Sequence, residues 1–252
     1  MRILLSNDDG INAPGLAVLE KIARQLSDDI VIVAPETDQS GVSHSLSLNN
    51  PLRLRQIEPH RFAVSGTPTD CVLMAIHEVL AGKKPDLILS GVNRGQNAAE
   101  DVTYSGTVAA AIEGTILGIP SIALSQAHGH SADIRWDVAA AHGAALIRRV
   151  LKCGIAPDTL INLNFPDCSP EEVIGAVTCV QGKRPLDFMG IDERKDARGN
   201  SYFWLNYAGK AFEPHPGTDL WALRNKRIAV TPLKINFTDN PSLTALAQEF
   251  GA

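Results

Sequence analysis

The sequence contains no apolar run that approaches the roughly 20 residues needed to cross a membrane. Three apolar residues separate Arg2 from Ser6, so the start of the chain offers no hydrophobic core of a secretory signal peptide. Low-complexity segments and internal repeats are also absent. We therefore expect a cytoplasmic globular protein with no membrane partner.

Cysteine is sparse and the net charge is small. The four cysteines form no C-x-x-C pair, and we expect reduced thiols in or near the core, at Cys71, Cys153, Cys168 and Cys179. A net charge of −5, from 28 acidic and 23 basic residues, argues against a surface that binds nucleic-acid polymers. This net charge is still compatible with a small anionic ligand, because a helix N-terminus and a cation can bind such a ligand locally.

Two familiar nucleotide-binding motifs are missing. No G-x-G-x-x-G follows the first apolar run, which argues against a dinucleotide cofactor. No Walker lysine follows the glycine at position 106, which argues against a P-loop NTPase. A nucleotide or phosphate ligand would therefore be bound by other means.

The order of apolar runs and helical patterns indicates the fold class. With 252 residues, 44% of them hydrophobic, the chain can bury a large core. Alternating strands and helices are typical of βαβ units and a parallel sheet. Strands are predicted over residues 3–5, 30–34, 87–90, 121–124 and 160–163, with a half-exposed edge strand or hairpin arm at 51–57. Helices are predicted from Pro14, from a cap at Thr69 and Asp70 to about Leu80, from about Ser105, and over 137–152.

The pattern changes after residue 166. Residues 173–180 and 201–205 resemble strands on either side of a charged segment at 192–198. We interpret 167–216 as a smaller β-rich arm suited to oligomer contacts. Residues 217–252 would then supply a strand that returns to the main body, at 227–231, and a terminal helix capped by Ser242. The whole chain is thus predicted to be one domain with an α/β core at 1–166.

Two adjacent carboxylates follow the first strand. Asp8 and Asp9 would lie where parallel sheets bind ligands, beyond the carboxyl ends of the strands. Neighbouring carboxylates repel each other unless a cation neutralises them, and a hard divalent ion prefers oxygen ligands. The alternative is a simple polar turn, since Asn, Asp and Gly are favoured turn residues.

Two further loops at strand ends are unusually polar. Residues 34–45 form a long hydroxyl-rich loop that contains Ser40 and His44, the one histidine that we consider as a proton carrier. Residues 90–97 form a glycine-rich turn, in which Asn93 would complete an oxygen shell with the two aspartates. Considered singly, either loop is also explained by glycines that permit tight turns.

A helix of small residues begins near Ser105. Free backbone N–H groups, the helix dipole and the hydroxyls of Ser105 and Thr107 would converge there, which suits a phosphate. A plain N-cap explains Ser105 but not Gly106 and Thr107.

Several separated motifs occur together in this order. They are residues 3–15 (ILLSNDDGINAPG), 34–41, 65–72 (SGTPTDCV), 90–95 (SGVNRG), 104–108 (YSGTV), 196–200, 217–219 and 230–233. In these motifs the sequence resembles the SurE (survival protein E) family of metal-dependent nucleotidases.

The resemblance implies a Rossmann-like α/β core and a homodimer or homotetramer whose C-terminal arms exchange between subunits. It implies hydrolysis of nucleoside monophosphates at the 5′ position, with 3′-nucleotidase and exopolyphosphatase activity in some members. By position, one Mg²⁺ or Mn²⁺ per subunit would be bound by Asp8, Asp9, Ser40 and Asn93, of which Asp8 and Asp9 are also catalytic. The phosphate-side positions are Asn97, Ser105, Gly106 and Thr107.

Two other functions are weighed against this one. An aspartyl-phosphate phosphatase usually places its two acids at alternate positions, whereas Asp8 and Asp9 are adjacent. A receiver-like signalling domain needs a phospho-accepting aspartate at a later strand end, where this chain has residues 90–93.

Overall fold

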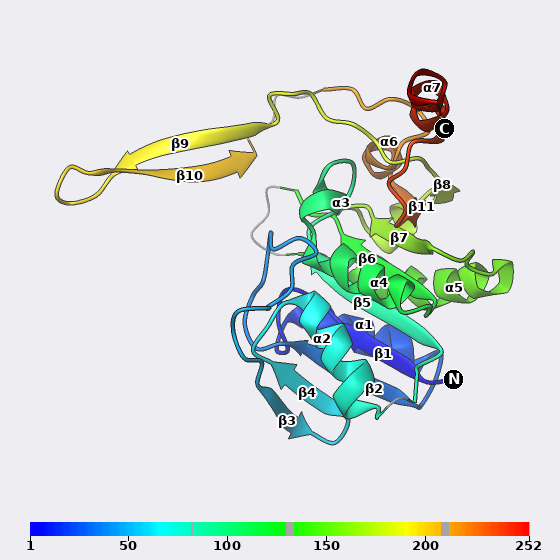
Figure 1. Ribbon diagram of the computed structural model, residues 1–252. Helices are drawn as coiled ribbons and strands as arrows, with labels where there is room; N and C mark the ends of the chain where they lie inside the picture. Colours follow the sequence, from blue (N-terminus) through cyan, green and yellow to red (C-terminus); the bar gives the residue numbers. More distant parts are fainter. Residues whose placement is uncertain (82, 130–133, 208–211, 252) are drawn as a thin grey trace.

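A nine-stranded sheet forms the centre of the molecule (Figure 1). The computed structural model describes residues 1–81, 83–129, 134–207 and 212–251. The sheet has the order β3-β4-β2-β1-β5-β6-β7-β11-β8, and β10-β9 form a separate pair. The strands are β1 (Ile3–Ser6), β2 (Ile30–Pro35), β3 (Leu54–Glu58), β4 (Arg61–Val64), β5 (Leu87–Arg94), β6 (Ser121–Gln126), β7 (Thr159–Phe165), β8 (Gly175–Thr178), β9 (Met189–Lys195), β10 (Ser201–Tyr207) and β11 (Arg227–Lys234). The helices are α1 (Pro14–Arg24), α2 (Pro68–Met74), the π-helix η1 (Ala75–Val79), α3 (Asp101–Tyr104), α4 (Gly106–Ile116), α5 (Asp137–Cys153), the 3₁₀ helix η2 (Pro170–Glu172), α6 (Asp219–Arg224) and α7 (Asn240–Phe250).

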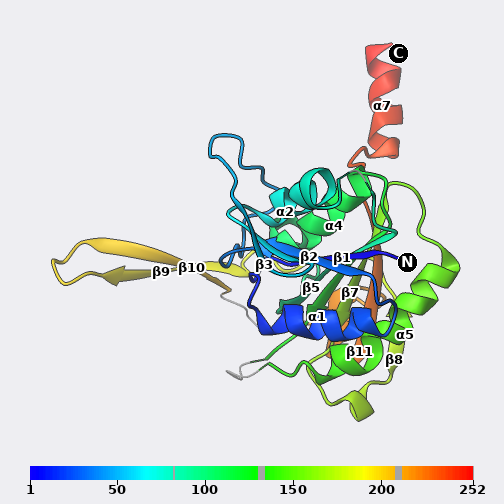
Figure 2. The same ribbon diagram turned by 90° about the horizontal axis from the view of Figure 1, so that it is seen from below.

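Helices cover both faces of this sheet. Alternate side chains of a strand point to opposite faces, so Ile3 and Leu5 pack in one cluster with α1 and α5, and Leu4 packs in another with α2 and α4. In Figure 2, α1 and α5 lie on one side of the sheet and α2 and α4 on the other. The central strands are buried on both faces and begin with apolar runs, as predicted, with polar residues only toward the carboxyl ends of β1 and β5. The predicted α/β fold class is confirmed.

The order in which strands are added to the sheet changes side at β1. The chain passes from β1 to β2 on one side and later enters β5 on the other, and both neighbours are parallel to β1. Such a switch point opens a crevice at the carboxyl ends of the two strands, where α/β proteins bind ligands. The loops after β1 and β5 therefore meet at one crevice.

The structure corrects two predicted helix caps. The N-cap of α2 is Thr67, whose hydroxyl accepts a hydrogen bond from the backbone N–H of Asp70, while the Asp70 carboxylate accepts one from the N–H of Thr67. Thr69 is therefore inside the helix. Likewise Asp239, not Ser242, caps α7, because its carboxylate accepts the N–H of Ser242. Strand β4 and helices α3 and α6 were not predicted.

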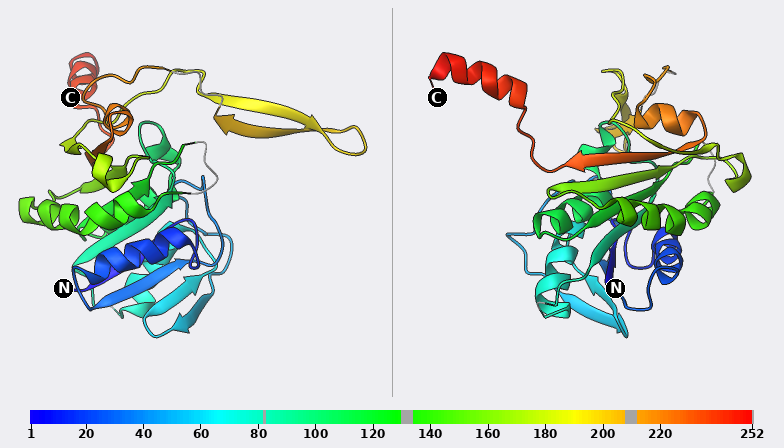
Figure 3. Two further views of the ribbon diagram at one scale, coloured as in Figure 1. Left: turned by 180° about the vertical axis from the view of Figure 1, so that it is seen from behind. Right: turned by 90° about the vertical axis from the view of Figure 1, so that its right-hand side faces the viewer.

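The arm also differs from its prediction. The charged segment at 192–198 belongs largely to a strand, since β9 pairs antiparallel with β10. The strand predicted at 173–180 is shorter, and as β8 it joins the main sheet beside β11. The β9-β10 hairpin projects from the body in Figure 1, and α7 projects in the right-hand view of Figure 3. None of the helices in the described ranges is long and apolar enough to cross a bilayer.

The cysteines are free thiols, as predicted. Cys71, Cys168 and Cys179 are buried. Cys153 is exposed, contrary to the prediction, because it ends α5 on the outer side of the molecule.

Candidate active site

Asn93 reaches the crevice because β5 is irregular near its end. The pairing of β5 with β6 shifts register between Ser90 and Asn93. Gly91, between them, has φ +131°, and an added Cβ would lie 2.2 Å from the carbonyl oxygen of Leu124. The glycine at this position therefore allows the strand to bend and to bring Asn93 close to the end of β1.

Asp8 is a buried carboxylate beside Asn93. Its side chain follows β1 and is 4% exposed. The fully buried hydroxyl of Thr107 hydrogen-bonds to the Asp8 carboxylate and lies 3.2 Å from Oδ1 of Asn93. Burial raises the pKa of Asp8 to about 6, the Thr107 hydrogen bond opposes this rise, and the charge of Asp9 adds to it.

Asp9 is less buried and has a different set of contacts. Its Oδ2 accepts the backbone N–H of Arg94 at 3.1 Å. Burial raises its pKa, the Arg94 hydrogen bond lowers it, and the nearby Asp38 carboxylate raises it. Asp9 and Asp38 line a second cavity of about 420 Å³, and Arg94 lines both this cavity and the main pocket.

The loop after β2 brings Ser40 to the same place. The backbone N–H of Gln39 donates to the carbonyl of Asp8 at 2.8 Å, which ties the loop to the end of β1. The Ser40 hydroxyl donates to Asp38 at 2.6 Å and lines the main pocket. His44 lies outside this pocket and pairs with Glu113 of α4 at 2.9 Å. The structure thus does not place His44 where it would transfer a proton to a ligand.

The four predicted metal ligands fit a hard divalent cation. Two carboxylates, an amide oxygen and a hydroxyl provide oxygen donors only, which suits Mg²⁺ or Mn²⁺. Within the described ranges, no group of three or more His, Cys, Asp and Glu side chains gathers around a common point. A metal here would therefore need the oxygens of Asn93 and Ser40 in addition to the two aspartates, and it would neutralise the buried charge of Asp8.

The start of α4 lies directly against Asp8. Ser105 caps the helix, since its hydroxyl accepts the backbone N–H of Val108 at 3.0 Å, and it lines the pocket. A Cβ on Gly106 would lie 2.7 Å from Cβ of Asp8, so glycine permits this close approach. Gly106 and Thr107 do not line the pocket. Both contact Asp8, Gly106 through its close approach to Cβ and Thr107 through its hydroxyl.

Asn97 is held in the pocket wall by buried polar side chains. Its backbone N–H donates to Asn164 at 2.8 Å, and its carbonyl accepts the side-chain amides of Asn162 at 2.8 Å and Asn164 at 3.1 Å. Its own amide donates to Ser125 at 2.9 Å. An amide nitrogen carries two hydrogens, so one remains for a ligand.

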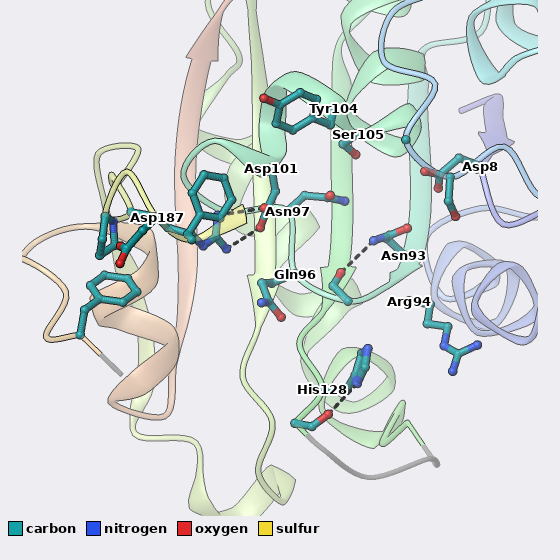
Figure 4. A pocket seen from close by; sticks show the side chains of 18 residues that line it. Asp8, Asn93, Arg94, Gln96, Asn97, Asp101, Tyr104, Ser105, His128 and Asp187 are labelled. Atoms are coloured by element: carbon teal, nitrogen blue, oxygen red, sulfur yellow. Dashed lines mark hydrogen bonds and ion pairs between the residues drawn. The ribbon is translucent and has the colours of Figure 1, made fainter. Parts of the chain in front are cut away.

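These side chains surround one pocket of about 680 Å³ (Figure 4). Of the predicted residues, Asp8, Ser40, Asn93, Asn97 and Ser105 line it. Tyr104, which begins the motif at 104–108, also lines the pocket, and sequence patterns did not point to the remaining lining residues Asp101, Arg184, Asp187, Phe188 and Phe212. Four of these come from residues far along the chain, and no local motif marks them.

The fold and the pocket define an α/β protein with a polar pocket at the switch point of a mostly parallel sheet. The family model described as "Survival protein SurE" matches residues 3–187. The chain belongs to the SurE family, as its motifs indicated.

Relatives match over the full length. A protein of Methylobacterium nodulans described as "5'-nucleotidase SurE" is 63% identical over 253 residues and covers 100% of both chains. One of Beijerinckia indica with the same description is 59% identical, covering 98% of this chain and 96% of its own. The crystal structure of the SurE protein from Aquifex aeolicus has a TM-score of 0.87 and 38% identity, covering 99% of this chain and 100% of that one.

Proposed function

We propose that this protein hydrolyses nucleoside monophosphates to nucleoside and phosphate as a divalent-metal-dependent 5′-nucleotidase. The observation that carries the proposal is the meeting of Asp8, Asn93 and the N-terminus of α4 at one pocket. A cation site and an anion site would then lie side by side, as metal-assisted hydrolysis of a phosphate ester uses them. The description of the relatives from Methylobacterium and Beijerinckia as 5′-nucleotidases supports the same activity.

Asp8, Asp9, Ser40 and Asn93 would hold one Mg²⁺ or Mn²⁺ per subunit. When bound, such an ion polarises a phosphoryl oxygen and lowers the pKa of water. Thr107 orients the Asp8 carboxylate through its hydroxyl. Asp9 is our candidate for the group that accepts the proton of the attacking water, because it is the more accessible of the two carboxylates.

The substrate phosphate would lie at the start of α4. The dipole of α4 favours an anion at its N-terminus, and the Ser105 hydroxyl and the Asn97 amide, which line the pocket, add hydrogen bonds. These donors are fixed before the substrate arrives, so they stabilise charge on the phosphoryl oxygens without reorganisation. The nucleoside leaves as the phosphorus–oxygen bond to it breaks.

The proposal extends to finer properties that the family resemblance implied. They are 3′-nucleotidase and exopolyphosphatase activity, a location in the cytoplasm, one domain with arm 167–216, and assembly into a homodimer or homotetramer. Self-association is supported by exposed apolar side chains on the hairpin, at Ile191, Phe203, Trp204 and Leu205.

A metal-dependent turnover assay tests the proposal. Phosphate release from AMP, GMP and p-nitrophenyl phosphate is measured with Mg²⁺, with Mn²⁺ and after removal of metal with EDTA. We expect turnover that chelation abolishes and that either ion restores. Unchanged turnover in EDTA would refute the metal-dependent mechanism, and trapping of a phosphorylated aspartate would favour the aspartyl-phosphate alternative.

A further inference from the structure

The sequence motif at 217–219 has no part in the proposed hydrolysis, yet its last residue, Asp219, is completely buried. Both oxygens of the Asp219 carboxylate accept backbone N–H groups. Oδ2 accepts that of Ala99 at 2.9 Å, and Oδ1 accepts those of Gly182 and Leu220, each at 2.8 Å. Burying a carboxylate is costly unless such donors surround it. Three backbone donors therefore satisfy this one.

These contacts join three separate parts of the chain. Ala99 follows β5, Gly182 lies between β8 and the β9-β10 hairpin, and Leu220 lies in α6, after the hairpin. A Cβ on Gly182 would lie 2.7 Å from Oδ1 of Asp219, so the lack of a side chain there permits the contact. Asp219 thus ties the two ends of the hairpin segment to the loop that follows β5.

The backbone at Ala99 has an unfavourable conformation. Ala99 is fully buried and has φ +53°, a left-handed value that residues with a Cβ seldom adopt and that persists only where the surrounding structure fixes it. Its N–H donates to Asp219, and its carbonyl accepts the side-chain amide of Gln181 at 2.8 Å. The Asp219 carboxylate and the Gln181 amide therefore fix the turn at Ala99 from both of its polar groups.

The turn at Ala99 determines where Asn97, two residues earlier, lies in the pocket wall (Figure 4). The Asn97 backbone is bound by Asn162 and Asn164 of β7. Residues 97–99 are thus held between β7 at one end and α6 at the other. If the end at Ala99 were released, the Asn97 amide could move, and a misplacement of about 1 Å in a site of this kind can cost about 100-fold in rate.

From these contacts we propose that Asp219 is a positioning residue, which fixes the turn at Ala99 and so directs the Asn97 amide toward the phosphate of the substrate. The inference rests on the proposed function and adds to it a residue that does not line the main pocket. Asp219 acts on the substrate only through Asn97.

The test is a double-mutant cycle of Asp219→Asn with Asn97→Ala, measured as kcat/KM for AMP at saturating Mn²⁺. Asparagine keeps the shape of aspartate but replaces one accepting oxygen with an NH₂ donor. If its oxygen keeps the two N–H groups at Oδ1, the NH₂ group faces the N–H of Ala99 and that hydrogen bond is lost. We expect Asp219→Asn to lower kcat/KM by about tenfold in the wild type. In Asn97→Ala it should lower kcat/KM by less than about twofold, because the amide that it positions is already absent.

Asp137→Asn is the matched control. Asp137 also begins a helix, α5, and its carboxylate accepts the N–H of the next residue, Val138, at 3.1 Å, but it does not line the main pocket. We expect its kcat/KM for AMP to equal that of the wild type.

Two results of the cycle would overturn the positioning role. They are equal factors of loss in the two backgrounds, as a contribution to stability alone would give, and an unchanged kcat/KM in a folded Asp219→Asn protein. If thermal unfolding shows that Asp219→Asn does not fold, the same cycle with Gly182→Ala decides, because the added Cβ displaces the Asp219 carboxylate without changing its chemistry.

A binding measurement separates this inference from the proposed function. Calorimetry with inorganic phosphate in the presence of Mn²⁺ should show about tenfold weaker binding to Asp219→Asn than to the wild type, and a difference below about twofold in the Asn97→Ala background. Absence of turnover on every ester, with this pattern of phosphate binding, would overturn the proposed hydrolysis and leave the positioning role supported. Turnover on AMP without this pattern would overturn the positioning role and leave the proposed function supported.

Discussion

Replacing Thr107 with valine tests whether a buried hydroxyl controls the cation site. Valine has nearly the same shape, so the substitution removes a hydrogen bond to Asp8 and a 3.2 Å contact to Asn93 without opening a cavity. A hydrogen bond to a charged group contributes about 1.5–3 kcal/mol to stability. The substitution removes the hydroxyl that orients the side-chain oxygens of Asp8 and Asn93. Removal of such a supporting partner typically weakens metal affinity by about 10- to 100-fold.

The assay is titration of AMP hydrolysis with Mn²⁺. We expect the concentration for half-maximal activation to rise by about 10- to 100-fold in Thr107→Val, with activity recovered in part at saturating metal. Thr107→Ser retains the hydroxyl and should stay close to the wild type. A Thr107→Val protein that is folded, as judged by its melting temperature, and needs no more Mn²⁺ than the wild type would refute the role given to this hydroxyl.

Three further predictions concern the same site. Asp8→Asn and Asp9→Asn should each abolish phosphate release from AMP, because each removes a charge that would bind the cation; near-normal turnover in metal-saturated buffer would contradict the assignment. Gly106→Ala should lower kcat for AMP by about tenfold or more, because its Cβ would lie 2.7 Å from Cβ of Asp8 and would displace the carboxylate, and unchanged kinetics would show that the site relaxes freely. Asn164→Ala should raise KM for AMP by about tenfold, since Asn97 would lose two of its hydrogen bonds, while an unaltered KM in a folded variant would mean that Asn97 needs no such support.

The acidic end of the site could be predicted because its signals are local. A short apolar strand followed by Asp8 and Asp9, and a later strand followed by Asn93, are visible in a few consecutive residues. Parallel strands in a βαβ arrangement bring their carboxyl ends to one edge, so position along the strand predicted that Asp8 and Asn93 lie close together. Ser105 was predicted from its place at a helix start as a phosphate-side residue, with a plain N-cap as the alternative; the structure shows the N-cap, and the phosphate role stays a prediction.

The supporting contacts could not be predicted, because they join residues far apart in the chain. Thr107 was taken from sequence as a phosphate-side residue, yet its hydroxyl turns toward Asp8, 99 positions earlier. Helix α4 packs mainly on β5 and β6, and no local pattern encodes the close approach of Gly106 to Asp8 beyond the end of β1.

The sequence by itself determined the alternation of strands and helices and the polar residues at their ends, since both follow from local periodicity and turn chemistry. Tertiary structure alone decided which distant side chains contact those polar residues. Arg184 reaches Asp101 across 83 positions, and Phe188 then closes a pocket that begins at Asp8. The physical reason is that long-range packing depends on the shapes and charges of both partners at once, whereas a motif records only one of them.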